Sequence, residues 1–333
     1  MKKYNVAVVG ATGMVGRMFL KVLEERKLPV ANYYLFASSR SAGSEVRFMG
    51  KNHIILELNK KNVEERQIDY ALFSAGASTS KEYAPIFAAQ GITVIDNSSC
   101  WRMDPDVPLV VPEVNPKAVD EMKKGIISNP NCSTIQAVVA LAPLHKKFKI
   151  KRIVYSTYQA VSGAGQQGYQ DLVEGIQGNP PKKFPHPIFA NLIPHIDSFL
   201  PDGYTKEERK MMDETRKIFS EPDFKITATT VRVPVFHGHS ESINVEFKKP
   251  CDMASLKAAL SEGKGLVLMD DVANNVYPMP KFIEDKDEVF VGRVRVDDSV
   301  KSGANIWVVA DNIRKGAATN AVQILQLLIK KNK

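Results

Sequence analysis

Cys132 is the residue of this sequence whose setting best suits nucleophilic chemistry. It follows a predicted strand and the proline turn Asn129–Asn131, and it opens the segment Ser133–Phe148, whose apolar spacing predicts a long helix. A thiol at a helix N-terminus lies at the positive end of the helix dipole, which favours the thiolate form. By position alone, a small buried cysteine is an equally good interpretation. Cys100 and Cys251 lack this setting, and we interpret them as structural.

A thiolate nucleophile also needs a base and groups that orient its substrate. The segment Thr230–Ser240 offers both. Arg232, on a predicted strand, could bind a carboxylate through its forked guanidinium, and His237 or His239 could act as the base. Structurally hydrogen-bonded histidines are the alternative. A metal site is not expected, because no acidic or thiol residue stands at ligand spacing from the two histidines.

A second chemical pattern is the glycine turn that follows the apolar run Tyr4–Val9. Gly10, Gly13 and Gly16 are three residues apart and lead into the helical pattern Arg17–Arg26. Glycines let the backbone approach a pyrophosphate, and the free N–H groups of a helix N-terminus attract it. The order strand, glycine turn, helix is the context that a dinucleotide-binding turn requires. A simple tight turn is the less favoured alternative.

The end of the second predicted strand, Tyr33–Ala37, discriminates between NAD and NADP. NAD-binding domains usually place an acidic residue here, where it binds the ribose 2′-hydroxyl. This chain instead has hydroxyls and a guanidinium that suit a 2′-phosphate, on Ser38, Ser39, Arg40 and Ser41. We therefore predict NADP as the cofactor. The alternative is a solvated Arg40 and an unselective site.

These groups must be positioned by a chain of two parts. Up to about residue 132, strand and helix patterns alternate, which predicts a parallel, doubly wound sheet. The strands expected there are 4–9, 33–37, 70–74, 92–96, 109–111 and 126–128, with a helix near 81–90. The later strands are longer and alternate in polarity, which predicts a mostly antiparallel sheet with one covered face. They are 150–161, 225–235, 242–248, 288–296 and 305–310, beside a loop region 178–201 and a charged helix 205–219.

The last segment predicts an amphipathic helix that needs a partner. Its apolar face consists of Ala318, Ala321, Val322, Leu325, Leu328 and Ile329. We expect this helix to return to the first domain and pack on its sheet. The predicted fold class is therefore α/β, with an N-terminal Rossmann-like dinucleotide-binding domain, residues 1–132 plus 314–333, and an α+β domain, residues 133–313.

Length and composition exclude several other classes of protein. The 333 residues suggest about two domains, and 44% hydrophobic with 25% charged residues is typical of a globular chain. Three scattered cysteines favour neither a disulfide framework nor a zinc site. No apolar run is long enough to cross a bilayer, and no signal-peptide pattern is seen, so we expect a cytoplasmic protein without a membrane partner. The net charge of +8 is scattered and suits anionic metabolites, and no nucleic-acid partner is expected.

Four short motifs occur together in an order that resembles the aspartate-β-semialdehyde dehydrogenase family. They are Gly10–Gly16 (GATGMVG), Ser128–Cys132 (SNPNC), Gln159–Gly165 (QAVSGAG) and His237–Ser240 (HGHS). With Asp311–Ala318 near the C-terminus, the resemblance spans nearly the whole chain. No catalytic position departs from the family pattern.

The resemblance implies roles for the matching positions. Cys132 would be the acyl-thioester nucleophile, His239 the general acid/base and Gln159 the residue that orients the substrate. Arg232 would bind the substrate α-carboxylate, Glu214 its amino group, Asn131 would hold it beside the thiol, and Arg102 and Lys217 would hold the phosphate. Helical charge pairs also explain Glu214 and Lys217. The cofactor contacts would be Gly10, Ala11, Thr12, Gly13, Met14, Val15, Ser38, Ser39, Arg40, Ser41, Ser162, Gly163 and Asn312.

The resemblance further implies a reaction and an assembly. The reaction would be the NADP-dependent reductive dephosphorylation of L-aspartyl-4-phosphate to L-aspartate 4-semialdehyde through a cysteine thioester. It would belong to the biosynthesis of lysine and diaminopimelate, threonine, methionine and isoleucine. The assembly would be a homodimer formed through the antiparallel sheet of the second domain, which would serve catalysis and dimerisation together.

Four rival functions are less consistent with the residues. N-acetyl-γ-glutamyl-phosphate reductases typically have Pro-Gly-Cys where this chain has Pro130-Asn131-Cys132, and the Ser-Cys-Thr-Thr setting of glyceraldehyde-phosphate enzymes is absent. A non-catalytic dinucleotide sensor would have no need of Gln159, Arg232 and His239 beside the thiol. A nucleic-acid-binding module would have to rest on the net charge alone.

Overall fold

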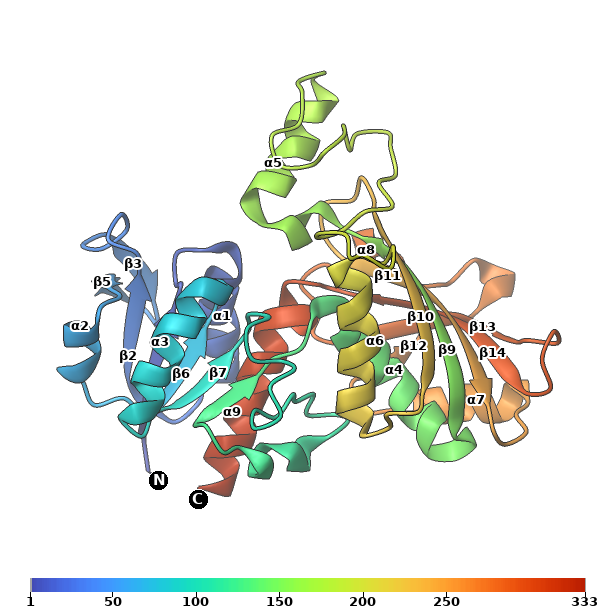
Figure 1. Ribbon diagram of the computed structural model, residues 1–333, viewed down its shortest axis with the longest axis horizontal. Helices are drawn as coiled ribbons and strands as arrows, with labels where there is room; N and C mark the ends of the chain where they lie inside the picture. Colours follow the sequence, from blue (N-terminus) through green and yellow to red (C-terminus); the bar gives the residue numbers. More distant parts are fainter. Residues whose placement is uncertain (1, 333) are drawn as a thin grey trace. The chain divides into compact units, whose positions relative to one another are not determined.

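The computed structural model describes residues 2–332, and their contacts form two units (Figure 1). One unit is Met1–Pro130 with Ala317–Lys333, and the other is Asn131–Gly316. The predicted boundaries, after residues 132 and 313, lie within three residues of these divisions. That the two units are separate domains remains a prediction. Within residues 2–332, none of the helices combines the length and the apolar character that a bilayer crossing requires.

The first unit is built on a six-stranded parallel sheet with the order β5-β2-β1-β6-β7-β8, as a doubly wound fold predicts. Its strands are β1 (Tyr4–Val9), β2 (Val30–Ala37), β5 (Leu56–Glu57), β6 (Tyr70–Phe73), β7 (Thr93–Asp96) and β8 (Ile126–Ser128). Its helices are α1 (Met14–Arg26), α2 (Lys60–Glu64), α3 (Ala77–Ala89), the 3-10 helix η1 (Pro116–Glu121) and α9 (Asn320–Lys331), and β3 (Glu45–Phe48) with β4 (Lys51–Ile54) forms a hairpin.

One predicted strand of this unit is wrong. Residues 109–111 form only a single bridge, between Leu109 and Ser128. Pro108 and Pro112 flank the segment. Because proline has no N–H to donate, the apolar run between the two prolines cannot extend into a ladder.

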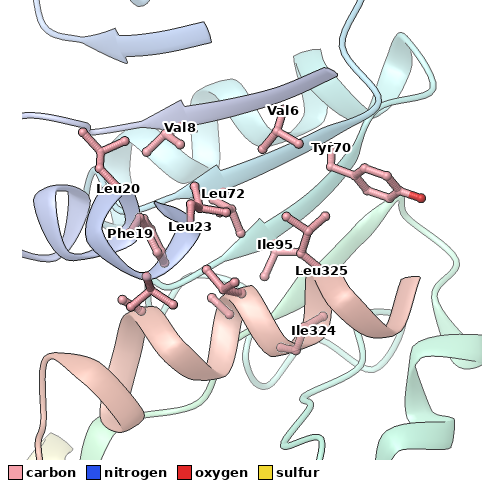
Figure 2. Packing of buried hydrophobic residues seen from close by; sticks show 14 of the residues in the cluster. Val6, Val8, Phe19, Leu20, Leu23, Tyr70, Leu72, Ile95, Ile324 and Leu325 are labelled. Carbon is pink, nitrogen blue, oxygen red and sulfur yellow. The ribbon is translucent and has the colours of Figure 1, made fainter. Parts of the chain in front are cut away.

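Helices α1 and α9 cover one face of the parallel sheet. Figure 2 shows Phe19 of α1 and Leu325 of α9 packed beside Val6 and Leu72 of the sheet, all within one buried cluster. Burying such aliphatic and aromatic side chains stabilises the fold by about 2 kcal/mol each. The C-terminal helix therefore covers a sheet built from the first third of the chain, and its apolar residues supply part of that core.

The second unit is a six-stranded mixed sheet with the order β10-β9-β11-β14-β13-β12. Its strands are β9 (Ile150–Gln159), β10 (Lys225–Arg232), β11 (His239–Phe247), β12 (Leu266–Leu268), β13 (Val289–Val296) and β14 (Gly303–Ala310). Its helices are α4 (Cys132–Phe148), α5 (Gly165–Ile176), α6 (Lys206–Phe219), α7 (Met253–Ser261), α8 (Pro280–Ile283) and the 3-10 helices η2 (Val161–Ala164) and η3 (Val272–Asn274). A π-helical segment, η4 (Arg314–Thr319), precedes α9.

The predicted antiparallel pairing holds for the four central strands but not at the edges. β10 runs parallel to β9, and β12 runs parallel to β13. Parallel neighbours require a crossover connection, and here α5 and α6 lie between β9 and β10 in the chain. Two strand ends of this sheet differ from the prediction by three residues. β10 ends at Arg232, shortly before Pro234, and β11 begins three residues early, at His239, because it pairs with strands on both sides.

Helix α5 was not predicted, because Gly165, Gly168 and Gly175 give its sequence a low helix propensity. Tertiary contacts compensate for that propensity. The carboxylate of Asp171 accepts three backbone N–H bonds of 2.8–2.9 Å from residues 182–184, and Leu172 lies in a small buried cluster. The long loop after α5 is therefore tied back to the helix.

Candidate active site

Asn131 places Cys132 at the start of α4. Its Oδ1 accepts hydrogen bonds from the N–H groups of Ser133 and Thr134, at 3.0 and 3.3 Å, so Asn131 is the N-cap and Cys132 the first helical residue. The helix start expected from the sequence is confirmed. The backbone of Gly316 passes so close that a Cβ there would lie 2.9 Å from the Cβ of Cys132. Glycine at this position therefore leaves room for the thiol-bearing residue.

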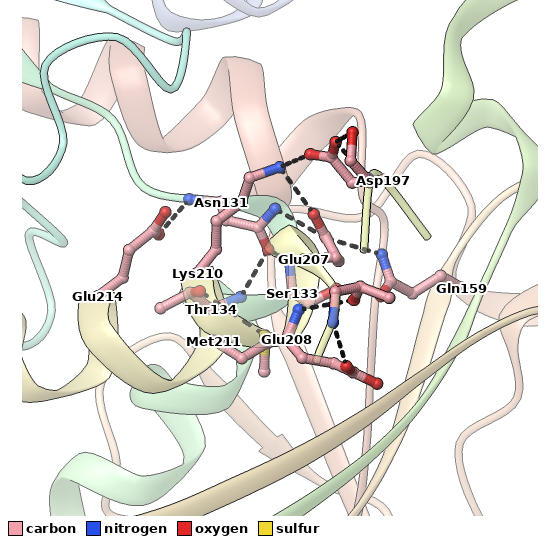
Figure 3. Close-up of polar contacts among 12 residues, drawn as sticks. Asn131, Ser133, Thr134, Gln159, Asp197, Glu207, Glu208, Lys210, Met211 and Glu214 are labelled. Carbon is pink, nitrogen blue, oxygen red and sulfur yellow. Dashed lines mark hydrogen bonds and ion pairs between the residues drawn. The ribbon is translucent and has the colours of Figure 1, made fainter. Parts of the chain in front are cut away.

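Two buried carboxylates of α6 hold the same asparagine (Figure 3). Oε2 of Glu214 accepts the backbone N–H of Asn131 at 2.7 Å. Oε1 of Glu207 accepts Nδ2 of Asn131 at 2.9 Å and Nε2 of Gln159 at 3.1 Å. Hydrogen bonds to a charged acceptor are among the stronger ones in proteins. Helix α6 therefore fixes both the residue that precedes the thiol and the amide of Gln159.

Glu207 is a site residue that the sequence analysis missed. Burial by itself would raise the pKa of Glu207, but the ammonium of Lys210 and the amides of Asn131 and Gln159 outweigh it and lower the pKa. Nζ of Lys210 lies 3.0 Å from the carboxylate. The site thus contains a stable negative charge. Helical spacing was the available signal, since Glu207 stands seven residues before Glu214 on the same face of α6.

The ends of three adjacent strands bring the other predicted residues together. Gln159 of β9 pairs with Arg232 of β10. His239 is the first residue of β11 and stands across from Gln159, one position beyond the pair formed by Ser240 and Tyr158. We call His239, Gln159 and Arg232 the catalytic layer. Residues far apart in the chain thus lie side by side at one end of the sheet.

His239 is fully buried in a defined tautomer. Its Nδ1 accepts the backbone N–H of Ala160 at 3.0 Å, which leaves the proton of a neutral imidazole on Nε2. Burial, together with the positive charge of Arg232, lowers the pKa of His239 to about 3. Nε2 has no hydrogen-bond partner within the described part of the chain. The side chain is therefore a neutral hydrogen-bond donor aimed into the site. His237, by contrast, is partly exposed and lies 3.6 Å from Glu284.

Arg232 keeps part of its guanidinium available. Nη1 donates a 2.6 Å hydrogen bond to the carbonyl of Ala160, whereas Nε is buried without a partner. Burial lowers the pKa of Arg232, and the carboxylate of Glu207 opposes that shift. A Cβ at Gly163 would lie 3.0 Å from Nη1 of Arg232 and 3.1 Å from Nε2 of His239. Gly163 therefore lets the backbone pass directly beside both side chains.

The amide of Gln159 is held at both ends. Its Oε1 accepts the hydroxyl of Thr157 at 2.9 Å, and its Nε2 donates to Glu207. These bonds distinguish the oxygen from the nitrogen of the amide, and they leave a second N–H that can donate to a ligand. Gln159 therefore presents a donor to the site.

Two residues predicted for the nicotinamide end of the cofactor lie close to the catalytic layer. The Ser162 hydroxyl and the Asn312 amide are hydrogen-bonded at 3.1–3.3 Å. Oδ1 of Asn312 also accepts the N–H of Gly238, the neighbour of His239. Gly163 follows Ser162 and lies beside His239. The second unit thus brings all three of these predicted residues together.

The two predicted phosphate-binding cations lie in different units. Lys217 follows Glu214 by three residues on the same face of α6. Arg102 belongs to the first unit, where Nε donates to the carbonyl of Asn129 and Nη2 to that of Asn97, both at 3.0 Å. The roles predicted for Arg102 and Lys217 remain predictions.

The glycine turn of the first unit follows β1, at the point where the strand order reverses between β2 and β6. Such a switch point is where doubly wound sheets bind dinucleotides. A Cβ at Gly10 would lie 2.3 Å from the carbonyl oxygen of Ser74, and one at Gly16 would lie 2.0 Å from that of Gly10. These two glycines serve the close packing of β1 with its neighbours. Gly13 is the N-cap of α1, and no side chain caps that helix.

The remaining predicted cofactor residues lie at the same edge of the sheet. Ala11 and Thr12 belong to the glycine turn, Met14 and Val15 begin α1, and Ser38–Ser41 follow β2. Arg40 is exposed in that second turn. An open helix N-terminus attracts a diphosphate, and an exposed guanidinium suits a 2′-phosphate. The residues present therefore fit the predicted dinucleotide.

Comparison with known proteins identifies the family. Residues 5–122 match the model of the semialdehyde dehydrogenase NAD-binding domain, and residues 141–315 match that of the semialdehyde dehydrogenase dimerisation domain. The aspartate-semialdehyde dehydrogenase of Aquifex aeolicus is 58% identical, over 98% of both chains. This chain belongs to the aspartate-semialdehyde dehydrogenase family.

Solved structures of aspartate-semialdehyde dehydrogenases share the fold. The Vibrio cholerae enzyme II complexed with ASA is 47% identical, with a TM-score of 0.93 over 99% of both chains. The Candida albicans enzyme with NADP is 26% identical, with a TM-score of 0.78 over 99% of both chains. The predicted fold class, α/β with a Rossmann-like domain joined to an α+β domain, is therefore confirmed for this member of the family.

The neutral state of His239 predicts a pH-dependent stability. Its folded pKa of about 3 lies below the unfolded value near 6.5, so the unfolded chain binds the proton more readily and stability falls as pH drops below 6.5. The part of the loss at pH 5 that His239 contributes should be about 2 kcal/mol. Urea unfolding of the parent and of His239→Gln at pH 7 and pH 5 measures this part. His239→Gln should remove this part of the loss, whereas His186→Gln, at an exposed position, should not. Equal losses in the parent and His239→Gln would contradict the assignment.

Proposed function

We propose that this protein is an NADP-dependent aspartate-β-semialdehyde dehydrogenase. It would convert L-aspartyl-4-phosphate to L-aspartate 4-semialdehyde and phosphate through a thioester on Cys132. The observation that carries this proposal is the joint placement of a capped helix-start cysteine and the catalytic layer within one unit. The Vibrio cholerae relative complexed with ASA supports the substrate. The reaction would serve the biosynthesis of lysine and diaminopimelate, threonine, methionine and isoleucine.

Charged side chains account for recognition of so polar a substrate. The buried guanidinium of Arg232 suits the α-carboxylate, because its Nε has no protein partner and burial strengthens the attraction. Glu214 would attract the amino group, beside the second buried carboxylate of Glu207. Arg102 and Lys217 would bind the phosphate. Asn131 is hydrogen-bonded to both carboxylates, so it would fix the position of the neighbouring thiol relative to these groups.

The first half of the reaction is an acyl transfer to sulfur. The Cys132 thiolate attacks the acyl carbon, the C–S bond forms, and the bond from that carbon to the phosphate oxygen breaks. The leaving phosphate takes the electron pair, and Arg102 and Lys217 stabilise its charge. The N–H of Gln159 that Glu207 does not accept donates to the acyl oxygen. Covalent catalysis of this kind divides one difficult step into two easier ones.

The second half releases the aldehyde. NADPH, when bound, supplies the hydride that reduces the thioester. His239 donates a hydrogen bond from Nε2 to the oxygen that becomes negatively charged, and one such donor contributes about 3 kcal/mol. When the C–S bond breaks, its electron pair returns to the sulfur of Cys132 and the oxyanion becomes the aldehyde carbonyl. A neutral His239 suits this role, since it holds its proton at the atom that faces the site.

Activity and its dependence on the thiol test the reaction directly. We expect phosphate-dependent reduction of NADP by aspartate-β-semialdehyde, measured as NADPH absorbance. Cys132→Ala should lose about 10³-fold or more, because removal of a nucleophile abolishes the covalent route. Cys251→Ala, whose thiol contacts the carbonyl of Gly303, serves as the matched control and should retain activity. An inactive parent that still binds NADPH would refute the substrate, and the N-acetyl-glutamyl analogue would be tested next.

The preference for NADP would rest on Arg40. The turn Ser38–Ser41 after β2 carries an exposed guanidinium and hydroxyls, and the Candida albicans relative is a complex with NADP. Arg40→Asp should weaken NADPH binding roughly 10- to 100-fold, the range for loss of a charged hydrogen bond, and leave NADH binding nearly unchanged. Fluorescence titration of both cofactors measures this, with the exposed Arg47→Asp as control. Unchanged NADPH affinity would remove Arg40 from the site.

A homodimer is the assembly that we propose. The matching family model is a dimerisation domain, and the sheet of the second unit has an exposed pocket of about 360 Å³. It is lined by Tyr158, Ser242, Tyr277, Pro278, Met279, Arg293, Arg295, Ile306 and Trp307. Sedimentation at micromolar concentration should give twice the chain mass of 37.0 kDa. Tyr158→Glu should favour monomer, whereas Ile54→Glu, exposed in the first unit, should not. A monomeric parent would contradict the proposal.

A further inference from the structure

A second row of polar side chains lies directly beneath the catalytic layer. Glu241 of β11 pairs with Thr157 of β9, and Thr157 pairs with Thr230 of β10. Each stands two positions along its strand from a residue of the catalytic layer, so it projects from the same face of the sheet. We call these three residues the second layer. The row below it returns to mostly apolar residues, namely Ile243, Tyr155 and Ala228.

The side chains of the second layer are buried, but most of their polar atoms lack hydrogen-bond partners in the described residues. All three side chains have no measurable exposure. Among residues 2–332, neither carboxyl oxygen of Glu241 has a hydrogen-bond partner, and the hydroxyl of Thr230 has none. Native proteins pair nearly all buried polar atoms, so several unpartnered atoms in one place require an explanation.

Helix α4 adds two more such atoms on the same side. It packs against β11, and Nε2 of Gln136 donates to the carbonyl of His239 at 3.2 Å. Oε1 of Gln136 and the hydroxyl of Ser133, one turn earlier on α4, are likewise buried without partners. A buried water makes about three hydrogen bonds. The five atoms of this region therefore match the needs of about two bound water molecules.

The charges around Glu241 favour its neutral form. α6 presents the carboxylate of Glu207, and β9 presents the phenol of Tyr155. The row above Glu241 contains Arg232 and the neutral His239. Burial, and then the negative charge of Glu207, raise the pKa of Glu241 well above its usual value. Unlike an ionised glutamate, a neutral one can donate a hydrogen bond.

That proton determines the direction of the hydrogen bonds above it. The hydroxyl of Thr157 donates to Oε1 of Gln159, and the lone pairs of its oxygen can accept a hydrogen bond in return. A neutral Glu241 can donate to this oxygen through a water molecule, because cross-strand partners have their Cβ atoms about 5 Å apart. An ionised Glu241 could only accept, and it would compete with Gln159 for the Thr157 proton.

We propose that Glu241, in its protonated form, and about two bound water molecules form a positioning layer that orients the amide of Gln159 through Thr157. Glu241 is a positioning residue, since it does not touch the reacting atoms. The functional consequence rests on the proposed dehydrogenase activity. The protonation and the bound water do not depend on it.

Two substitutions separate a positioning role from a merely structural one. Glu241→Gln keeps the shape and a donor, so it should retain at least about a third of the parent kcat. Glu241→Leu removes the donor while its apolar side chain suits burial, so it should fold stably but lose about 10-fold or more in kcat with little change in the KM for phosphate. Full kcat in Glu241→Leu would overturn the positioning role. Equal losses in both variants would show that the ionised carboxylate is required.

A readout without turnover distinguishes this proposal from the proposed function. Infrared spectra of protein labelled with ¹³C-glutamate should show the carbonyl band of a protonated carboxyl at pH 7, and Glu241→Gln should lack it. In urea unfolding, the stability of the parent relative to Glu241→Gln should fall as pH rises above about 4.3, the unfolded value. The neutral His239 acts in the opposite direction up to about pH 6.5, but it is present in both proteins and cancels from this comparison. A high-resolution crystal structure should show water bonded to Glu241. No protonated band, or a dry second layer, would overturn the proposal even if the enzyme is active.

Discussion

The hydrogen bonds of Asn131 are the interactions on which the candidate site depends. One side chain caps α4 through its oxygen and binds Glu207 through its nitrogen, while its backbone N–H binds Glu214. Loss of an asparagine cap alone costs about 1 kcal/mol, and hydrogen bonds to charged groups contribute about 1.5–3 kcal/mol. The carboxylates that hold Asn131 come 76 and 83 residues later in the chain. The position of the thiol therefore requires that α6 fold against the start of α4.

The same contacts arrange charge within a buried region. A carboxylate out of water is unfavourable unless it is paired and hydrogen-bonded, and Glu207 receives Asn131, Gln159 and Lys210. Its negative charge in turn lies near Arg232. Because burial, and then the positive charge of Arg232, lowers the pKa of His239, its imidazole stays neutral. The site thus combines a cation for an anionic substrate with an imidazole that holds its proton at Nε2.

The register of β9, β10 and β11 determines which polar side chains lie side by side on the second sheet. Along the sheet edge, it aligns a donor, an amide and a guanidinium on neighbouring strands, and two positions farther along each strand it aligns Glu241, Thr157 and Thr230. In the first unit, the glycine turn obeys a different constraint. A Cβ at Gly10 or Gly16 would lie only 2.0–2.3 Å from a backbone oxygen. Backbone packing alone therefore requires glycine at these two positions, whether or not a ligand binds there.

Much of the fold and the catalytic set could be predicted from the sequence, because the signals are local. The proline turn followed by the apolar spacing of Ser133–Phe148 predicts a helix that Cys132 opens, and alternating strand and helix patterns predict a doubly wound sheet. Two features could not be predicted from local sequence patterns. Crossover connections determine the parallel direction of the edge strands β10 and β12, and tertiary contacts stabilise the glycine-rich helix α5.

Only the tertiary structure decided which polar side chains share an environment. Glu207 and Glu241 are ordinary glutamates in the sequence, and each has a charge state that depends on neighbours from other elements. The sequence by itself determined which residues could do chemistry and on which elements they stand. The pairing of β9, β10 and β11 decided which of them meet, because a strand's period assigns a side chain to a face but not to a neighbour.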